Sequence, residues 1–320
     1  MRFEILGKYY EVIDTKEKIT IADSFVVRQN KIGFGNGEAK LYVGQEGDLL
    51  REFFGDRGFS HQCFLLKKDL LQYLEETKVE YLHPEQHYIN KEILPKLWDE
   101  RKKAIEQLPD CIDFEIEEQT QIQGSRIYIK SKDDGYKILR ELSLPNITYI
   151  TIVKLKDTKG EIFYYFKLFA DYFGDVVHPY LQKQEEKIAE DAIDKPITRA
   201  RKGQGKYREE LLHMCPYCPI TMVSDERILI ASHIKPWIAS DDIEKIDPYN
   251  GFMFTPTYDY LFDRGYLSFS DDKRVKLSPF LSKMTYAKLG ISDGKIIQHL
   301  PIKGREKYLK YHRDKIFQGI

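Results

Sequence analysis

The segment that most constrains the fold begins at a short apolar run, Ile228–Ala231, which is followed directly by Ser232 and His233. A short apolar run bounded by turn residues predicts a strand. Pro236 has no backbone N–H to donate, so regular strand pairing is expected to stop soon after His233. The imidazole is therefore expected at the end of a strand, where a turn begins.

A second strand and a helix follow closely. Asn250 and the glycine after it lead into the apolar run Phe252–Phe254, which predicts a strand. A proline just before the next segment and a glycine just after it predict a short helix over Thr257–Asp263. This helix carries Asp259. A third strand is predicted over Tyr266–Ser270.

This unit of two strands and a helix places one polar residue at each corner, and the three residue types suit phosphodiester hydrolysis. That reaction needs a base for water and a cation for the developing charge. A neutral imidazole such as His233 suits the first task. A carboxylate such as Asp259 suits Mg²⁺, which prefers oxygen ligands. The amide of Asn250 can hold the loop that carries the histidine by bonding backbone groups.

The pattern resembles the HNH, or ββα-metal, endonuclease family of bacterial restriction and modification-dependent nucleases. The resemblance covers Thr198–Phe269, including a lead-in at 201–208, and it does not extend to the first part of the chain. It is carried by Ser-His-Ile-Lys-Pro-Trp at 232–237, Asn-Gly at 250–251 and Asp-Tyr-Leu-Phe-Asp-Arg-Gly-Tyr-Leu-Ser-Phe at 259–269.

The resemblance implies a role for each matching residue. His233 falls on the general base, Asn250 on the residue that braces the loop, and Asp259 on a ligand of Mg²⁺ or Mn²⁺. Ser232 stands where many members carry a second metal ligand, an Asp or a His, so the metal is expected to have fewer protein ligands or to recruit another group such as Asp263. The family also implies products with 5′-phosphate and 3′-hydroxyl ends.

Two cations near these residues are candidates for binding the scissile phosphate. Lys235 offers a point charge and Arg264 a forked guanidinium. Solvated surface charge is the competing interpretation of both.

The CxxC pair Cys215 and Cys218 raises the question of a structural zinc. Zinc sites of this kind use two such pairs, and no second pair follows Cys218. His213 offers a third ligand, but a fourth is missing. The sequence therefore favours core cysteines without zinc.

The first part of the chain predicts an α+β recognition domain, because strands and helices do not alternate as in βαβ units. The turn Asp157–Gly160 predicts a hairpin, and Gly33–Gly37 lacks the Lys-Ser/Thr of a phosphate loop. Helices are expected over Lys67–Tyr81 and Asn90–Leu108. Strands are expected over Phe3–Ile13, Ile19–Val27, Ile112–Ile116, Ser125–Ile129, Ile147–Lys156 and Glu161–Phe169.

The composition changes between the two parts. A charged, helix-compatible stretch, Gln182–Ile193, precedes Pro196, and a basic run extends from Lys195 to Arg208. We expect a recognition or effector-sensing domain over 1–180, a linker and basic lead-in over 181–205, and the nuclease domain over 206–320. The basic run is either a solvated linker or a segment that contacts the DNA backbone.

Composition indicates which partners and which cellular compartment suit the protein. The net charge of −1 does not mark a nucleic-acid binder, although a local stripe suffices to contact phosphates. Four cysteines do not suggest a disulfide framework, and no apolar run approaches membrane-spanning length. We therefore expect a cytoplasmic protein without a membrane segment.

The function expected from the sequence is a metal-dependent endonuclease of restriction type that acts on double-stranded DNA. One such site cuts one strand, so a homodimer matching the symmetry of duplex sites is expected. Three alternatives stay open: a modification-dependent endonuclease that flips out a base, a ligand-activated defence nuclease, and a non-catalytic DNA-binding module.

Overall fold

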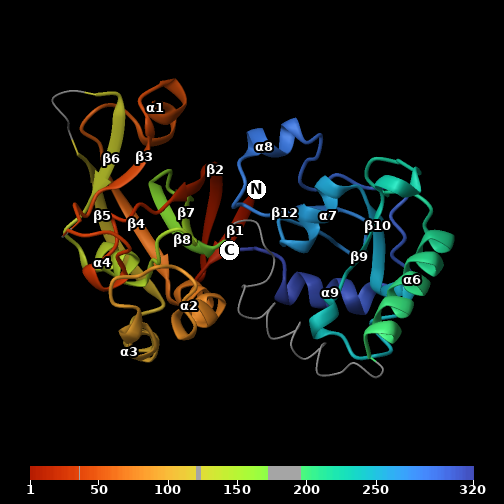
Figure 1. Ribbon diagram of the computed structural model, residues 1–320. Helices are drawn as coiled ribbons and strands as arrows, with labels where there is room; N and C mark the ends of the chain where they lie inside the picture. The colour runs from red at the N-terminus through yellow and green to blue at the C-terminus, as the bar shows by residue number, and fades with distance from the viewer. Residues whose placement is uncertain (36, 120–123, 172–195) are drawn as a thin grey trace. The chain divides into compact units, whose positions relative to one another are not determined.

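The computed structural model describes residues 1–35, 37–119, 124–171 and 196–320, with the side chains of 196–204 outside this description (Figure 1). Contacts divide the chain into two compact units, residues 2–187 and residues 188–320 together with Met1. None of the helices in the described ranges is long and apolar enough to cross a membrane.

A mixed sheet forms the centre of the N-terminal unit. Its strands lie in the order β1-β2-β7-β8-β4-β5-β6-β3 within the described residues. Neighbouring strands are antiparallel except β4 and β8, which run parallel. This confirms the expected α+β class. The strands are β1 (Arg2–Ile5), β2 (Lys8–Thr20), β3 (Leu41–Gln45), β4 (Ser60–Leu66), β5 (Cys111–Glu118), β6 (Arg126–Lys130), β7 (Thr148–Asp157) and β8 (Ile162–Ala170).

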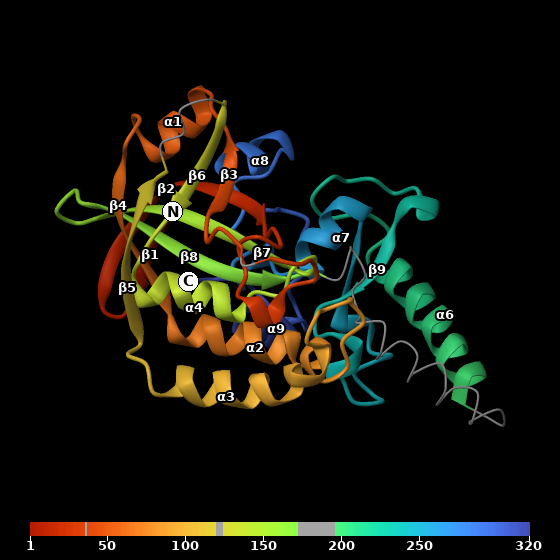
Figure 2. The ribbon, with the colours of Figure 1, turned by 60° about the vertical axis from the view of Figure 1, so that its left-hand side comes forward.

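Helices α2, α3 and α4 lie on one side of this sheet (Figure 2). Helix α2 has Leu70, Tyr73 and Leu74 at helical spacing, and all three are buried in the same core as Phe114 and Phe166 of the sheet. The apolar stripe of the helix is thus what seals this face. The helices of this unit are α1 (Asp48–Phe54), α2 (Lys67–Leu82), α3 (Leu94–Glu106) and α4 (Asp134–Leu142), with 3-10 turns at Arg28–Asn30 and Lys91–Ile93.

The predicted hairpin between β7 and β8 is present. Oδ1 of Asp157 accepts hydrogen bonds from the backbone N–H groups of Lys159 and Glu161, both at 2.8 Å. Gly160 has φ +92°, which favours glycine at this turn.

The strand predicted over Ile19–Val27 is wrong for most of its length. Strand β2 ends at Thr20, and the following residues turn, with the N–H of Phe25 donating to the carbonyl of Ala22 at 2.9 Å. Phe25 and Val26 are fully buried. Their apolar character therefore reflects burial of a turn and not strand pairing.

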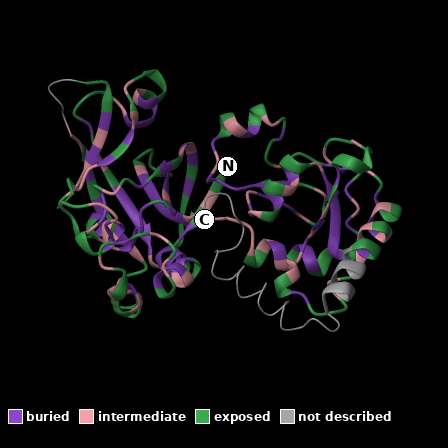
Figure 3. Ribbon diagram, in the orientation of Figure 1, coloured by how far each residue is buried: buried purple, intermediate pink, exposed green. Residues whose placement is uncertain are grey.

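The C-terminal unit contains two small sheets, β9 with β10 and β11 with β12, among the described residues. Phe252 and Phe254 of β10 pack against Phe262 of α7 and Phe269 of β11. Figure 3 shows β10 buried along its length. The elements are α6 (Pro196–Met214), β9 (Ile230–His233), β10 (Gly251–Phe254), α7 (Pro256–Asp263), β11 (Leu267–Phe269), β12 (Val275–Leu277), α8 (Lys283–Lys288) and α9 (Glu306–Lys315).

The linker expected over 181–205 coincides in part with helix. Residues 181–195, including the stretch Gln182–Ile193 and Lys195, lie outside the described residues. Helix α6 begins at Pro196, where a proline is tolerated in the first turn.

Candidate active site

The β9–β10 hairpin places two neighbouring residues on opposite faces. His233 pairs with Gly251, and Ser232 pairs with Phe252. Successive strand residues point to opposite sides, so His233 and Ser232 leave the hairpin in opposite directions. Strand β9 ends at His233, as the position of Pro236 predicts.

His233 is held from several directions. Its Nε2 donates to the carbonyl oxygen of Lys245 at 3.0 Å. Its ring lies flat on that of Tyr207, with centroids 4.1 Å apart and an interplanar angle of 13°, and Trp237 contacts it at 85°. Burial lowers the pKa of His233, with the bond to Lys245 opposing the shift. The imidazole is therefore neutral near pH 7.

The proton on this ring can be assigned from its partner. A carbonyl oxygen can only accept, so Nε2 carries the hydrogen and Nδ1 has a lone pair. Nδ1 has no hydrogen-bond partner within the described part of the chain. The imidazole is thus oriented with its basic nitrogen available.

The amide of Asn250 holds together both ends of the loop between β9 and β10. Its Oδ1 accepts from the backbone N–H of Lys235 at 2.8 Å. Its Nδ2 lies within hydrogen-bond distance of the carbonyls of Lys235 and Glu244 and of Oγ of Ser240. Asn250 is fully buried, so these contacts replace those it would make with water.

Asp259 lies on the other face of the hairpin, at Ser232. The Ser232 hydroxyl faces the Asp259 carboxylate and lowers its pKa. Burial outweighs this effect and, together with the negative charge of Asp263, raises the pKa of Asp259. Burial also raises the pKa of Asp263 one helical turn later, and Arg264 opposes that shift. Two crowded carboxylates and a hydroxyl form a set of oxygen donors that a hard cation would stabilise.

The structure therefore brings the predicted residues together in two groups. His233 and Asn250 lie at the loop end of the hairpin, and Asp259 and Ser232 lie across the β9–α7 contact. Ser232 and His233 are consecutive and therefore point to opposite sides of β9. A phosphate could contact both groups only if it lay around the end of this strand.

The set of oxygen donors fits Mg²⁺ better than zinc. No group of three His, Cys, Asp or Glu residues that could hold a metal occurs among the described residues. Mg²⁺ accommodates such a site because it commonly keeps several water ligands and takes one or two carboxylates. Asp259 and Ser232 are therefore compatible with a hydrated Mg²⁺ or Mn²⁺.

The two predicted phosphate ligands differ in availability. The ammonium of Lys235 is paired with the carboxylate of Glu244 and lies 5.3 Å from the Tyr311 ring centroid. Arg264 ends helix α7 and lies over the ring of Tyr260 at 5.6 Å. Lys235 would have to leave Glu244 before it could bind a phosphate, whereas the structure shows no carboxylate paired with Arg264 in the described ranges.

Cys215 and Cys218 are both free and buried. Burial raises the pKa of Cys215, and its Sγ lies 3.4 Å from the carbonyl oxygen of Tyr217. The N–H of Cys218 donates to Val223, and its carbonyl accepts from Met222. These contacts place the two cysteines in a buried turn that directly follows α6.

Two residues to which the sequence analysis gave no individual role support this site. The hydroxyl of Tyr207 in α6 donates to the carbonyl oxygen of Asn250 at 3.1 Å. Arg305 is 2% exposed, and its Nε donates to the carbonyl of Gly251 at 2.9 Å. Both act on the backbone at the start of β10, from elements distant in sequence.

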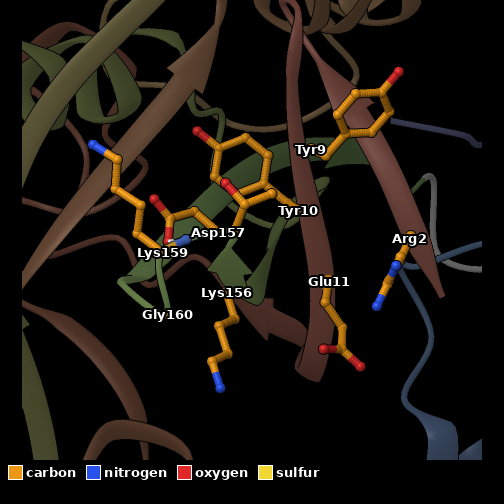
Figure 4. A pocket seen from close by; sticks show the side chains of 9 residues that line it. Arg2, Tyr9, Tyr10, Glu11, Lys156, Asp157, Lys159 and Gly160 are labelled. Atoms are coloured by element: carbon orange, nitrogen blue, oxygen red, sulfur yellow. Dashed lines mark hydrogen bonds between the residues drawn. The ribbon is translucent and has the colours of Figure 1, made fainter.

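A separate cavity of about 610 Å³ lies in the N-terminal unit, beside strands β1 and β2 and the turn between β7 and β8 (Figure 4). Its wall carries cations and acids together: Arg2, Lys156 and Lys159 beside Glu11 and Asp157. This balance of charge does not favour a phosphate.

Residues 218–270 match the family model described as HNH endonuclease. The C-terminal region contains an HNH endonuclease domain. The match includes the β9–β10 hairpin and α7, and it excludes Tyr207 and Arg305. No curated protein matches the chain.

The HNH endonuclease family implies hydrolysis of phosphodiester bonds in nucleic acid, with a divalent metal as the usual cofactor. The motif residues at 232–237, 250–251 and 259–269 lie within the matched range, except that the part of the resemblance before Cys218 lies outside it.

Proposed function

We propose that the protein is a restriction-type endonuclease that cuts double-stranded DNA with His233 as the general base. The observation that supports this most is the state of the imidazole. Burial lowers its pKa and so favours the neutral form, its Nε2 is fixed by Lys245, and its Nδ1 is available to accept a proton from water.

The other predicted residues have complementary tasks. Asn250 keeps the loop in the conformation that presents Lys245 to His233. Asp259, with Ser232 beside it, would hold Mg²⁺ or Mn²⁺, and the bound ion would supply charge stabilisation for the transition state and the leaving 3′ oxygen. Arg264 would contact the phosphate from the end of α7.

The products would carry 5′-phosphate and 3′-hydroxyl ends. One HNH domain cuts one strand, so we propose that a homodimer cuts both strands of a duplex site. The N-terminal unit would then select the target. Free cysteines are compatible with the cytoplasm as the working compartment.

Nicking of supercoiled plasmid in Mg²⁺ tests the proposal. His233→Ala should slow cleavage by about 10²–10⁴-fold, the usual contribution of a general base. His299→Ala, at an exposed histidine of the same unit, is the matched control and should cut like the wild type. Equal rates for His233→Ala and the wild type would overturn the assignment.

The same assay on methylated and unmethylated plasmids, with the ends sequenced, tests the restriction-type assignment. A repeated end sequence on unmethylated DNA supports it. Cleavage confined to methylated DNA, or random ends, contradicts it.

A further inference from the structure

Tyr207 has two contacts that meet at the proposed base. Its ring covers one face of the His233 imidazole at 4.1 Å, and its hydroxyl donates to the carbonyl oxygen of Asn250. One side chain from α6 thus touches both of the signature residues of the hairpin, although it lies outside the range matched by the family.

The space around the glycine that pairs with His233 shows how closely Tyr207 approaches the backbone of the hairpin. A Cβ at Gly251 would lie 2.0 Å from the Tyr207 hydroxyl oxygen and 2.8 Å from Cδ2 of Leu211. Gly251 has an extended backbone with φ −162°, so glycine is needed here for space and not for its dihedral angle. The Asn-Gly pair of the motif therefore accommodates the tyrosine of α6.

Helix α6 is itself fastened where Tyr207 is presented. The guanidinium of Arg208, the next residue, donates to the carbonyls of Leu229 and Glu226 just before β9. Leu211, one turn later, is fully buried in the same core. The ring of Tyr207 consequently has a fixed position relative to the hairpin.

We infer that Tyr207 is a positioning residue for His233, which fixes the plane of the imidazole through the stacked ring and fixes the neighbouring backbone through the hydroxyl. This inference rests on the proposed role of His233. Trp237 and the carbonyl of Lys245 restrict the ring edge, and Tyr207 restricts the ring face. Together they leave Nδ1 as the atom directed to the substrate.

Two substitutions separate the ring from the hydroxyl. Tyr207→Phe keeps the stacked ring and loses the bond to Asn250, whereas Tyr207→Leu loses both. Tyr286→Leu is the control, because Tyr286 is a buried tyrosine of the same core whose hydroxyl donates to the carbonyls of Tyr266 and Ser278.

The readouts are kcat and KM of the full chain and the NMR contact (NOE) between the ring protons of His233 and Trp237. Tyr207→Leu should lower kcat by about tenfold with KM little changed, since the base is misplaced. It should also weaken the NOE between His233 and Trp237, because the plane of the imidazole is no longer fixed. Tyr207→Phe should keep that NOE and lose less of kcat.

The inference is overturned if Tyr207→Leu leaves kcat and the NOE between His233 and Trp237 as they are in Tyr286→Leu. The NOE does not require cleavage, so a failed nuclease assignment and a failed positioning role are distinguishable. A wild type without cleavage, combined with a weakened NOE in Tyr207→Leu, would contradict the proposed function alone. Should Tyr207→Leu fail to fold, Tyr207→Met, which has an apolar side chain without a ring, takes its place with the same outcomes.

Discussion

Nε2 of His233 and the carbonyl oxygen of Lys245 lie 3.0 Å apart, and this contact joins the end of β9 to the far side of the loop that follows it. It fixes the tautomer of the imidazole without charging it, because a carbonyl is a neutral acceptor. A carboxylate in this place would instead favour the imidazolium, which cannot act as a base.

The pH dependence of cleavage follows from this environment. Burial lowers the pKa of His233, so the acid limb of kcat should have its midpoint below about pH 6.5, the ordinary value for histidine. The unfolded chain binds the proton more readily, so the group should also cost stability as pH falls below about 6.5. Cleavage rates from about pH 5 to pH 8 at fixed free Mg²⁺ measure the limb. A midpoint above about pH 7 would contradict a neutral, buried base.

In the absence of metal, the negative charge of Asp259 should lower the free energy of unfolding. Its pKa is raised by burial and by Asp263, so the cost is absent at low pH and grows as pH rises above the ordinary value of 3.8. Asp259→Asn should therefore raise the melting temperature in EDTA at pH 7. It should also abolish both cleavage and the stabilisation by Mg²⁺.

A melting series with and without Mg²⁺ checks this expectation. Asp314→Asn, at an exposed carboxylate paired with Lys310 on α9, is the control and should retain the response to Mg²⁺. A lower melting temperature for Asp259→Asn in EDTA would show that the carboxylate stabilises the metal-free fold, against the direction argued here.

The crowding at Gly251 gives a further prediction. Gly251→Ala should destabilise the protein by about 1–3 kcal/mol, because the added methyl overlaps the Tyr207 hydroxyl in a packed core. Tyr207→Phe in the same chain removes that oxygen and should recover part of the loss. Urea unfolding of both single variants and the double variant measures this coupling.

Gly205→Ala provides the comparison for Gly251→Ala. A Cβ there meets nothing within 4 Å, and Gly205 lies within α6, so this change should be neutral or stabilising. Additive effects of Gly251→Ala and Tyr207→Phe would mean that the hydroxyl is not what the methyl meets.

The sequence predicts the elements whose pattern is periodic. The expected helix Lys67–Tyr81 corresponds to α2, because its buried residues recur at helical spacing, and the expected strand Ile147–Lys156 corresponds to β7, which is rich in β-branched residues. Strand β4 (Ser60–Leu66) was not predicted. Its last residues, Cys63 to Leu66, are all buried, so the alternation that identifies a half-buried strand is absent.

The same holds for the candidate site: residues within local sequence patterns could be predicted, and residues placed there by tertiary packing could not. His233 and Asn250 could be named because each begins or ends a short element with its own turn residues. No role could be predicted for Tyr207 or Arg305, since an aromatic residue in a helix and an arginine before a helix are ordinary in sequence. Only the packing of α6 and of the segment before α9 places them on β10.

The last prediction concerns Lys235, which the structure pairs with Glu244. Glu244→Gln should release the ammonium for phosphate and tighten DNA binding at low salt by several-fold. The slope of log K against log salt should steepen by about one, as expected for one added phosphate contact. Fluorescence anisotropy with a DNA duplex at several salt concentrations measures both quantities. Lys235→Met in the Glu244→Gln background is the control and should cancel the gain. If Glu244→Gln binds DNA with the wild-type affinity and salt slope, then Lys235 does not bind phosphate. Its charge then stabilises the loop through the pair with Glu244.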